Sequence, residues 1–132
     1  ARGEAKFAHV DVRDIAAVAV KALTEPAHGG QSYTLTGPEA ITYDELAQEL
    51  SAVLGRAIRH ISLPPEDLKH GMLAEGLPEA IADRMLDLER YYREDQASRI
   101  THDIQRVTGQ EPRRFAQYIR DYGSLLQPAL VA

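Results

Sequence analysis

The chain of 132 residues contains no cysteine. This absence excludes disulfides, thiolate catalysis and a cysteine-ligated zinc site within the chain. Long apolar runs are missing too, since the longest, Ile15 to Val20, falls far short of the roughly 20 residues that a membrane-spanning helix needs. No signal-peptide pattern and no lipidation motif is present. We therefore expect a cytoplasmic protein without a membrane partner.

A clustered basic surface is also missing. The formal net charge is −5, and 15 lysines and arginines are scattered among 20 acidic residues. The densest basic points, Arg90-Tyr91-Tyr92-Arg93 and Arg113-Arg114, adjoin glutamates, which is typical of a solvated helix face. Nucleic-acid binding needs clustered cations that neutralise phosphates, so nucleic acid is not an expected partner.

Two kinds of cofactor motif are absent. The nine glycines never fall as G-x-G-x-x-G or G-x-x-G-x-x-G, so the chain has no phosphate-binding turn of the dinucleotide type. Glu66 and His70 have the i, i+4 spacing of two metal ligands on a helix, but no third ligand follows at a suitable spacing. We expect no metal site.

The first half of the chain alternates strand and helix patterns. Short apolar runs predict strands at Ala5 to Val10, Gln31 to Thr36 and Ala57 to Leu63. The helix after the first strand has Asp11 as its expected cap, and its expected core face consists of Ile15, Val18, Ala19, Ala22 and Leu23.

The helix after the second strand starts with a capping box. Thr42 and Glu45 have the required spacing, and Gly55 provides the left-handed stop. Strands joined by helices in this order predict an α/β fold over residues 1–63, with a short parallel sheet of about three strands and crossover helices.

Residues 64–126 show helix patterns only and predict an all-helical cap. Pro78 fits the first turn of one helix, Thr101 is the expected cap of another, and Gly109 is its expected stop. The tail, residues 127–132, is expected to be frayed.

Three segments together resemble one family. Phe7 to Ala16 is similar to the late strand-to-helix junction of NmrA-like and related atypical short-chain dehydrogenases, and Tyr33 to Thr42 is similar to their next strand and helix. Val107 to Arg113, followed by Phe115, resembles their closing helix pair. The resemblance implies a partial Rossmann-type architecture: residues 1–63 as the C-terminal part of the sheet and residues 64–126 as the lobe over the substrate.

The resemblance also implies a function. Members bind NADPH or NADH in their first half and reduce quinones, enals or polyketide-type compounds, and a few are regulatory sensors without turnover. We expect this chain to be the C-terminal, substrate-side half of such a reductase, inactive and without cofactor on its own. Its expected partners are a small-molecule substrate and either the missing N-terminal half or a second copy of itself. The alternatives are a dinucleotide-sensing regulator and a stand-alone interaction module.

The chain starts with Ala1 and enters a strand pattern almost at once, which favours a piece of a longer protein, with a processed or tagged chain as the alternative. No tyrosine is followed four residues later by lysine, so the catalytic pair of typical short-chain dehydrogenases is absent, and no catalytic residue is assigned.

Six residues are candidates for substrate binding: His9, Asp11, Arg13, Thr36, Tyr43 and Met72. Asp11, Arg13 and Thr36 lie at or just past strand ends, where open α/β sheets place their ligands. Each has a structural alternative: a hydrogen-bonded histidine for His9, a helix cap with its ion pair for Asp11 and Arg13, a turn served by Gly37 for Thr36, and an exposed first-turn residue for Tyr43. Met72 belongs to an apolar group that lines either a pocket or an ordinary core (Leu68, Met72, Leu73, Ile81 and Met85).

Overall fold

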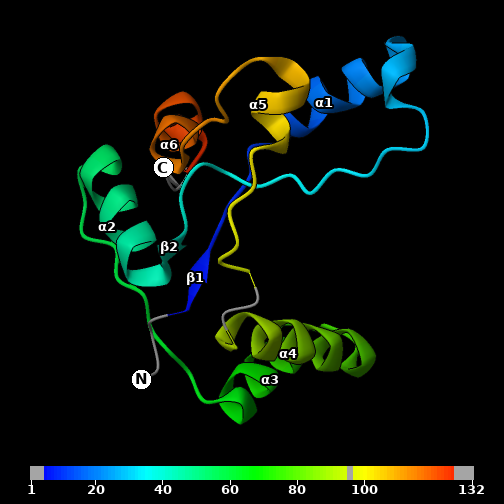
Figure 1. Cartoon of the computed structure of the whole chain (residues 1–132). Helices are drawn as coiled ribbons and strands as arrows, with labels where there is room; N and C mark the ends of the chain where they lie inside the picture. The colour runs from blue at the N-terminus through cyan, green and yellow to red at the C-terminus, as the bar shows by residue number, and fades with distance from the viewer. Residues whose placement is uncertain (1–4, 95–96, 127–132) are drawn as a thin grey trace.

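The computed structural model describes residues 5–94 and 97–126, which form two short strands and six helices. In chain order these are β1 (Lys6–Phe7), α1 (Val12–Thr24), the 3-10 turn η1 (Pro26–His28), β2 (Ile41–Thr42), α2 (Tyr43–Leu54), α3 (Pro65–Ala74), α4 (Glu79–Arg93), α5 (Asp103–Thr108), α6 (Phe115–Tyr122) and the 3-10 turn η2 (Gly123–Leu126). Figure 1 shows β1 near the middle, α1, α5 and α6 on one side of it, and the α3–α4 pair on the other.

The sheet differs from the one expected. In the described residues, β1 pairs with β2, antiparallel, with Phe7 opposite Ile41. The parallel sheet of three strands does not form there, because the other two predicted strands bond to side chains. Asp103 accepts from the backbone N–H of Thr34 at 2.8 Å, and the hydroxyl of Thr101 donates to the carbonyl of Thr34.

The segment 57–63 also bonds to a side chain and not to another strand. The backbone N–H of Ile58 donates to the hydroxyl of Ser51 at 2.8 Å, and this hydroxyl donates in turn to the carbonyl of Ala47 at 2.7 Å. The segment is therefore fastened to α2 instead of to a neighbouring strand. The mixed α/β character of the chain remains, with helix predominating.

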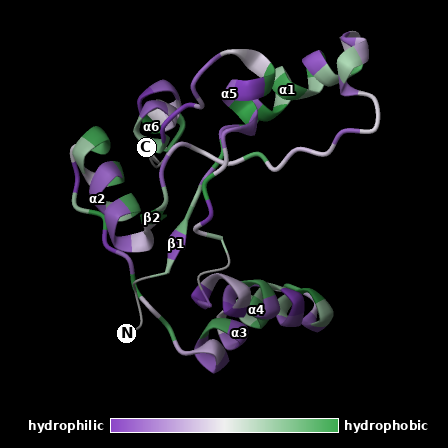
Figure 2. Ribbon diagram, viewed as in Figure 1, coloured by the Kyte–Doolittle hydropathy of each residue, from purple (hydrophilic) through white to green (hydrophobic). Residues whose placement is uncertain are grey.

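Helix α1 starts at the expected residue, but most of its expected core face is exposed. Asp11 is the N-cap and accepts from the backbone N–H of Arg13 at 2.8 Å. Of the five residues of the expected core face, Val18 is buried, whereas Leu23 is 86% exposed. Helix α1 packs on α5, and the described chain leaves the side opposite Val18 uncovered. Figure 2 shows apolar residues along α1.

Helix α2 confirms the capping box. The Thr42 hydroxyl accepts from the backbone N–H of Glu45 at 3.1 Å, and the Glu45 carboxylate accepts from the backbone N–H of Thr42 at 2.7 Å. Gly55 ends the helix in the left-handed conformation, with φ of 66°. This start fixes the direction in which Tyr43, the first residue of α2, leaves the backbone.

The second half is helical in its described residues, as expected. Helix α3 packs on α4, whereas α5 packs on α1 and α6 on α2. The prediction that Thr101 caps α5 is wrong: His102 occupies the cap position, because the Thr101 hydroxyl bonds to Thr34. Gly109 ends α5 with φ of 74°, as predicted. The predicted frayed tail lies outside the described residues.

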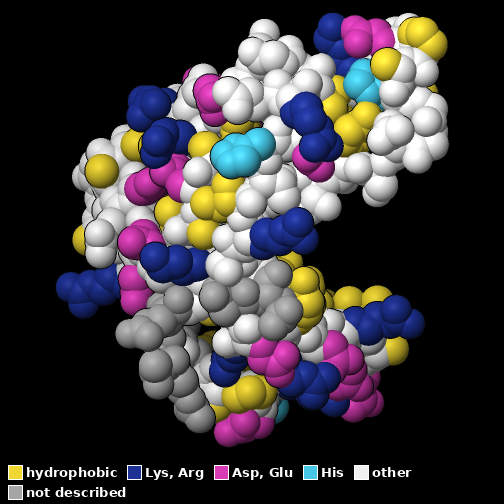
Figure 3. Space-filling model, in the orientation of Figure 1, with side chains coloured by type: hydrophobic (Ala, Val, Ile, Leu, Met, Phe, Trp, Pro, Cys, Tyr) yellow, Lys and Arg dark blue, Asp and Glu magenta, His cyan; other side chains and the backbone are white. Residues whose placement is uncertain are grey.

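The α3–α4 pair is set apart from the rest of the molecule. Figure 3 shows a deep notch between this pair and the body that carries α1, α5 and α6. The backbone of Ala8, just after β1, joins two other segments of the chain. Its N–H donates to the carbonyl of Ala97 at 2.9 Å, and its carbonyl accepts from the N–H of Gly37 at 3.4 Å. None of the described helices is long and apolar enough to cross a membrane.

Candidate functional site

The candidate site is built around the aromatic ring of Phe7. This ring is 5% exposed, and its centroid lies 4.5 Å from that of Tyr43 and 5.0 Å from that of Tyr92. Tyr43 also contacts the imidazole of His60, with 5.1 Å between ring centroids. The rings come from β1, the start of α2, the end of α4 and the segment that leads to α3. Together they form an aromatic wall.

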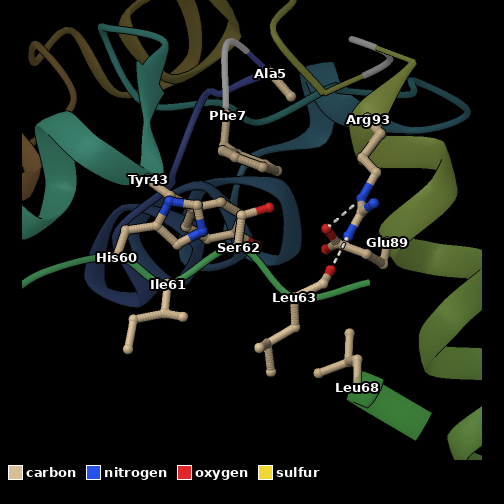
Figure 4. Close-up of a pocket in the computed structure, with 10 residues that line it drawn as sticks. All are labelled: Ala5, Phe7, Tyr43, His60, Ile61, Ser62, Leu63, Leu68, Glu89 and Arg93. Carbon is tan, nitrogen blue, oxygen red and sulfur yellow. Dashed lines mark hydrogen bonds and ion pairs between the residues drawn. The ribbon is translucent and has the colours of Figure 1, made fainter. Parts of the chain in front are cut away.

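Beside this wall lies a cavity of about 340 Å³. It is lined by Ala5, Phe7, Tyr43, His60, Ile61, Ser62, Leu63, Leu68, Glu89 and Arg93. Figure 4 shows the rings of Phe7, Tyr43 and His60 on one side and the side chains of Leu63, Leu68, Glu89 and Arg93 on the other. A cavity with mostly apolar walls and a few polar groups is typical of a small-molecule site.

The polar end of the cavity is an ion pair on α4. The Nε of Arg93 donates to Oε1 of Glu89 at 2.9 Å, and Nη2 of Arg93 donates to the carbonyl of Leu63 at 3.2 Å. These bonds tie the C-terminal part of α4 to the segment that carries His60. They fix the position of the α4 side of the cavity relative to the side formed by the segment with His60.

Burial raises the pKa of the Tyr43 hydroxyl, and the nearby Glu89 carboxylate adds to the increase. The hydroxyl therefore stays protonated at neutral pH and can donate a hydrogen bond. Behind the ring of His60, Asp44 lies with Oδ1 at 3.2 Å from Nδ1. The cavity thus offers stacking surfaces, a phenolic donor and a carboxylate.

Of the six predicted site residues, Tyr43 lines this cavity. His9 and Asp11 line a second hollow of about 300 Å³, together with Val10, Val12, Arg113, Arg114, Phe115 and Tyr118. Partial burial lowers the pKa of His9. The structure therefore divides the predicted set between two places instead of gathering it.

Asp11 and Arg13 form the local ion pair that was their structural alternative. The guanidinium of Arg13 bonds to Asp11 at 2.6 Å and to Asp121 of α6 at 2.7 Å, so it ties α1 to α6. The side-chain hydrogen bond from Arg13 lowers the pKa of Asp11. Arg13 does not line either hollow.

Thr36 and Met72 lie away from both hollows. Thr36 is 8% exposed, and its hydroxyl accepts from the backbone N–H of Thr101 at 2.9 Å, so it joins two segments. Met72 is half-buried on α3 and does not line the cavity beside the aromatic wall, whereas Leu68, one turn earlier, does.

Sequence reasoning missed Phe7, His60, Glu89 and Arg93. The interpretation of residues 90–93 as a solvated face is wrong for Arg93, whose side chain is 33% exposed and lines the cavity. A signal was available: Glu89 and Arg93 are four residues apart and adjoin the apolar repeat of α4. No group of three His, Cys, Asp or Glu side chains within the described ranges has a geometry suited to a metal ion.

Comparison with known proteins places the chain in a family. It is 39% identical over 122 residues to an NAD(P)H azoreductase of Xenophilus azovorans, a match that covers 92% of this chain and 43% of the azoreductase. The chain thus spans less than half the length of this relative.

Two solved structures share the fold. The NADPH-dependent quinone oxidoreductase QOR2 of Escherichia coli, solved with NADPH, matches with a TM-score of 0.82 and 25% identity over 96% of this chain and 44% of its own. The triphenylmethane reductase of Citrobacter sp., solved with NADP(H), matches with a TM-score of 0.78 and 28% identity over 91% of this chain and 42% of its own. The NmrA-like family model matches residues 1–122, and the chain belongs to that family.

Proposed function

We propose that this chain is the C-terminal, substrate-side half of an NAD(P)H-dependent reductase. The observation that carries the proposal is the cavity of about 340 Å³ between the aromatic wall and α4. Its size lies at the lower end of the range of about 300–1,000 Å³ for small-molecule pockets. The reductase character is supported by the relatives, whose names include an azoreductase, a quinone oxidoreductase and a triphenylmethane reductase.

The described residues, 5–94 and 97–126, do not fit the phosphates of a dinucleotide. The four described glycines with positive φ are Gly30, Gly55, Gly76 and Gly109, which lie at turns or helix ends. The close approach at Gly37 is filled by the backbone of His9. At the start of α2, the Thr42 hydroxyl already accepts from the backbone N–H of Glu45. We therefore place the NADP or NAD site of the parent protein outside this chain.

A titration tests this assignment. The isolated chain, titrated with NADPH and with NADH in a calorimeter, should give no binding at micromolar concentrations. A one-site isotherm in that range would contradict it.

The cavity residues have defined roles in this proposal. Phe7 and Tyr43 provide faces against which a planar substrate stacks, and Leu63 and Leu68 exclude water from its other side. The hydroxyl of Tyr43 donates a hydrogen bond to an acceptor atom of the substrate. The Glu89–Arg93 pair keeps α4 against the cavity. These groups orient a conjugated acceptor such as a quinone or an enal, and the reductant is held elsewhere.

The test of the function uses the full-length protein that contains this chain. It should oxidise NADPH or NADH when a quinone or an enal is added, and its rate should depend on the acceptor concentration. Cofactor binding without oxidation for any such acceptor would indicate a dinucleotide sensor instead. A stable chain encoded without a dinucleotide-binding region would indicate an interaction module.

A further inference from the structure

The cavity beside the aromatic wall has a carboxylate turned toward its rings. In Figure 4 the Glu89 oxygens face the side on which Tyr43 and His60 lie, and the guanidinium of Arg93 lies on their other side. Oε1 of Glu89 accepts from Arg93. Among residues 5–94 and 97–126, no donor bonds to its second oxygen. The ligand-facing part of the ion pair is therefore its negative end.

The charged groups around the cavity include more carboxylates than guanidinium groups. Glu89 brings a carboxylate beside the cavity, and Asp44, whose side chain is 62% exposed, brings a second one that lies against the imidazole of His60, whereas Arg93 brings one guanidinium. Two of the N–H groups of Arg93 are already bound, to Glu89 and to the carbonyl of Leu63. The pKa of Tyr43 responds to this arrangement, because Glu89 raises it more than Arg93 lowers it.

The aromatic rings also attract cations. The faces of Phe and Tyr carry negative electrostatic potential and attract a cation within about 6 Å of the ring centroid. Phe7 and Tyr43 form a corner, with centroids 4.5 Å apart and ring planes at 48°. A planar ligand placed against this corner would lie between ring faces and a carboxylate.

We propose that this cavity prefers planar conjugated cations to neutral acceptors of the same shape, and that the faces of Phe7 and Tyr43 and the carboxylate of Glu89 hold these cations. The inference rests on the proposed function, in which the cavity is the substrate site. Its test measures binding alone and requires neither the cofactor nor turnover.

The test uses three tricyclic probes of one shape and three charges. N-methylacridinium is the cation, acridine at pH 8 is the neutral form, and acridine-9-carboxylate is the anion. Each is titrated into the ¹⁵N-labelled chain, and the backbone amide shifts are followed at Tyr43, Ile61 and Glu89. The cation should bind about tenfold more tightly than acridine, the anion more weakly than acridine, and the shifts should centre on this cavity.

Two matched variants identify the carboxylate responsible. Glu89→Gln keeps the shape and an acceptor for Arg93, and it should bring the affinities for the cation and for acridine within about twofold of each other. Asp87→Asn makes the same charge change on the same helix, at a side chain that is 69% exposed and paired with Arg90. It should leave the preference unchanged. Circular dichroism of both variants checks that they fold.

The proposal would be overturned by equal affinity for the cation and acridine, by a preference that survives Glu89→Gln, or by the absence of shifts in this cavity with any probe. Shifts centred on Asp11 and Phe115 instead would assign the binding to the second hollow and overturn it too. None of these results would remove the reductase function, which acceptor-dependent cofactor oxidation by the full-length protein tests separately.

Discussion

Gly37 shows how a single residue holds two segments together. A Cβ atom at this position would lie 1.9 Å from the carbonyl oxygen of His9, which is backbone and cannot turn aside. We expect Gly37→Ala to lower the free energy of unfolding by about 3 kcal/mol, the upper range for overpacking a filled site. Chemical denaturation would show this as a lower midpoint with an unchanged slope.

A second glycine provides the control. Gly71 lies inside α3, and a Cβ built on it meets no atom within 4 Å. Gly71→Ala should therefore raise the free energy of unfolding by about 0.5–1 kcal/mol, because alanine loses less backbone entropy in a helix. Equal effects of the two substitutions would show that the approach of Gly37 to His9 is not a constraint.

The sequence assigned local roles to single residues better than long-range ones. The Asp11 cap could be predicted because it depends on a residue two positions away, and it is confirmed. Gly37 was expected to serve a turn, but its close partner is His9, 28 positions earlier in the sequence. Thr36 became a site candidate because its partner Thr101 is 65 residues away and no local pattern reveals that bond.

At the scale of elements, the capped start of α2 determines where Tyr43 lies, since Tyr43 is the first residue of this helix. Thr42→Ala removes the hydroxyl that accepts from Glu45 N at 3.1 Å, and it should lower the free energy of unfolding by about 1 kcal/mol. Urea denaturation of the variant and the unmodified chain at pH 7 measures the difference. An unchanged midpoint would count against the cap.

The other half of the capping box should depend on pH. The backbone N–H of Thr42 donates to the Glu45 carboxylate and lowers its pKa from 4.5 in the folded state. A lowered folded-state pKa gives stability that is complete above pH 4.5 and is lost as the pH falls through the lower value. Glu45→Ala should therefore be less stable than the unmodified chain at pH 7, and the gap should narrow in acid.

Gln48→Ala, at an exposed position of the same helix, is the control, and its stability difference should not change over that pH range. A gap for Glu45→Ala that stays constant into acid would show that the carboxylate does not act through its charge.

Helices and their ends could be predicted because their signals are local. The start of α2, its stop at Gly55 and the stop of α5 at Gly109 all depend on residues within one turn. The strands could not be predicted in the same way, since a strand is defined by its partner. The segment 31–36 has a suitable composition, yet the N–H and the carbonyl of Thr34 bond to side chains near the start of α5.

At the scale of the whole molecule, α1 carries an uncovered apolar face. Val12, Val20 and Leu23 are 66%, 60% and 86% exposed, and their spacing puts them on one side of the helix, opposite Val18. The pattern did reveal that α1 has an apolar face, but it could not show that the described residues leave this face open. The segment at β1, in contrast, has partners: Phe7 lies opposite Ile41 of β2, and the N–H of Ala8 donates to the carbonyl of Ala97.

We therefore expect the isolated chain to associate through α1. Exposed apolar surface costs about 25 cal/mol per Å², so burying a few hundred Å² in a dimer offsets several kcal/mol. Sedimentation equilibrium should give a mass that rises with concentration above 14.6 kDa, and Leu23→Glu should reduce the rise. A single species of 14.6 kDa over a wide concentration range would show that α1 does not drive association.

The division of site residues between two hollows also belongs to this scale. His9 lies on a predicted strand and Tyr43 in the first turn of a predicted helix, and only the arrangement of β1, α2 and α4 shows that Tyr43 alone of the two reaches the cavity beside the aromatic wall. Glu89 and Arg93 enter the site because α4 folds back against the segment at His60, a contact across about 30 residues.

The most direct test of the account compares Tyr43→Leu with Tyr118→Leu in the full-length protein. Tyr43 lines the proposed substrate cavity, and Tyr118 lines the second hollow. For Tyr43→Leu we predict a fall of about tenfold in kcat/KM for a quinone acceptor, with the Kd for NADPH unchanged. For Tyr118→Leu both values should stay within about twofold of the unmodified protein. The opposite pattern, with acceptor reduction impaired by Tyr118→Leu and unaffected by Tyr43→Leu, would contradict the assignment of this cavity as the substrate site.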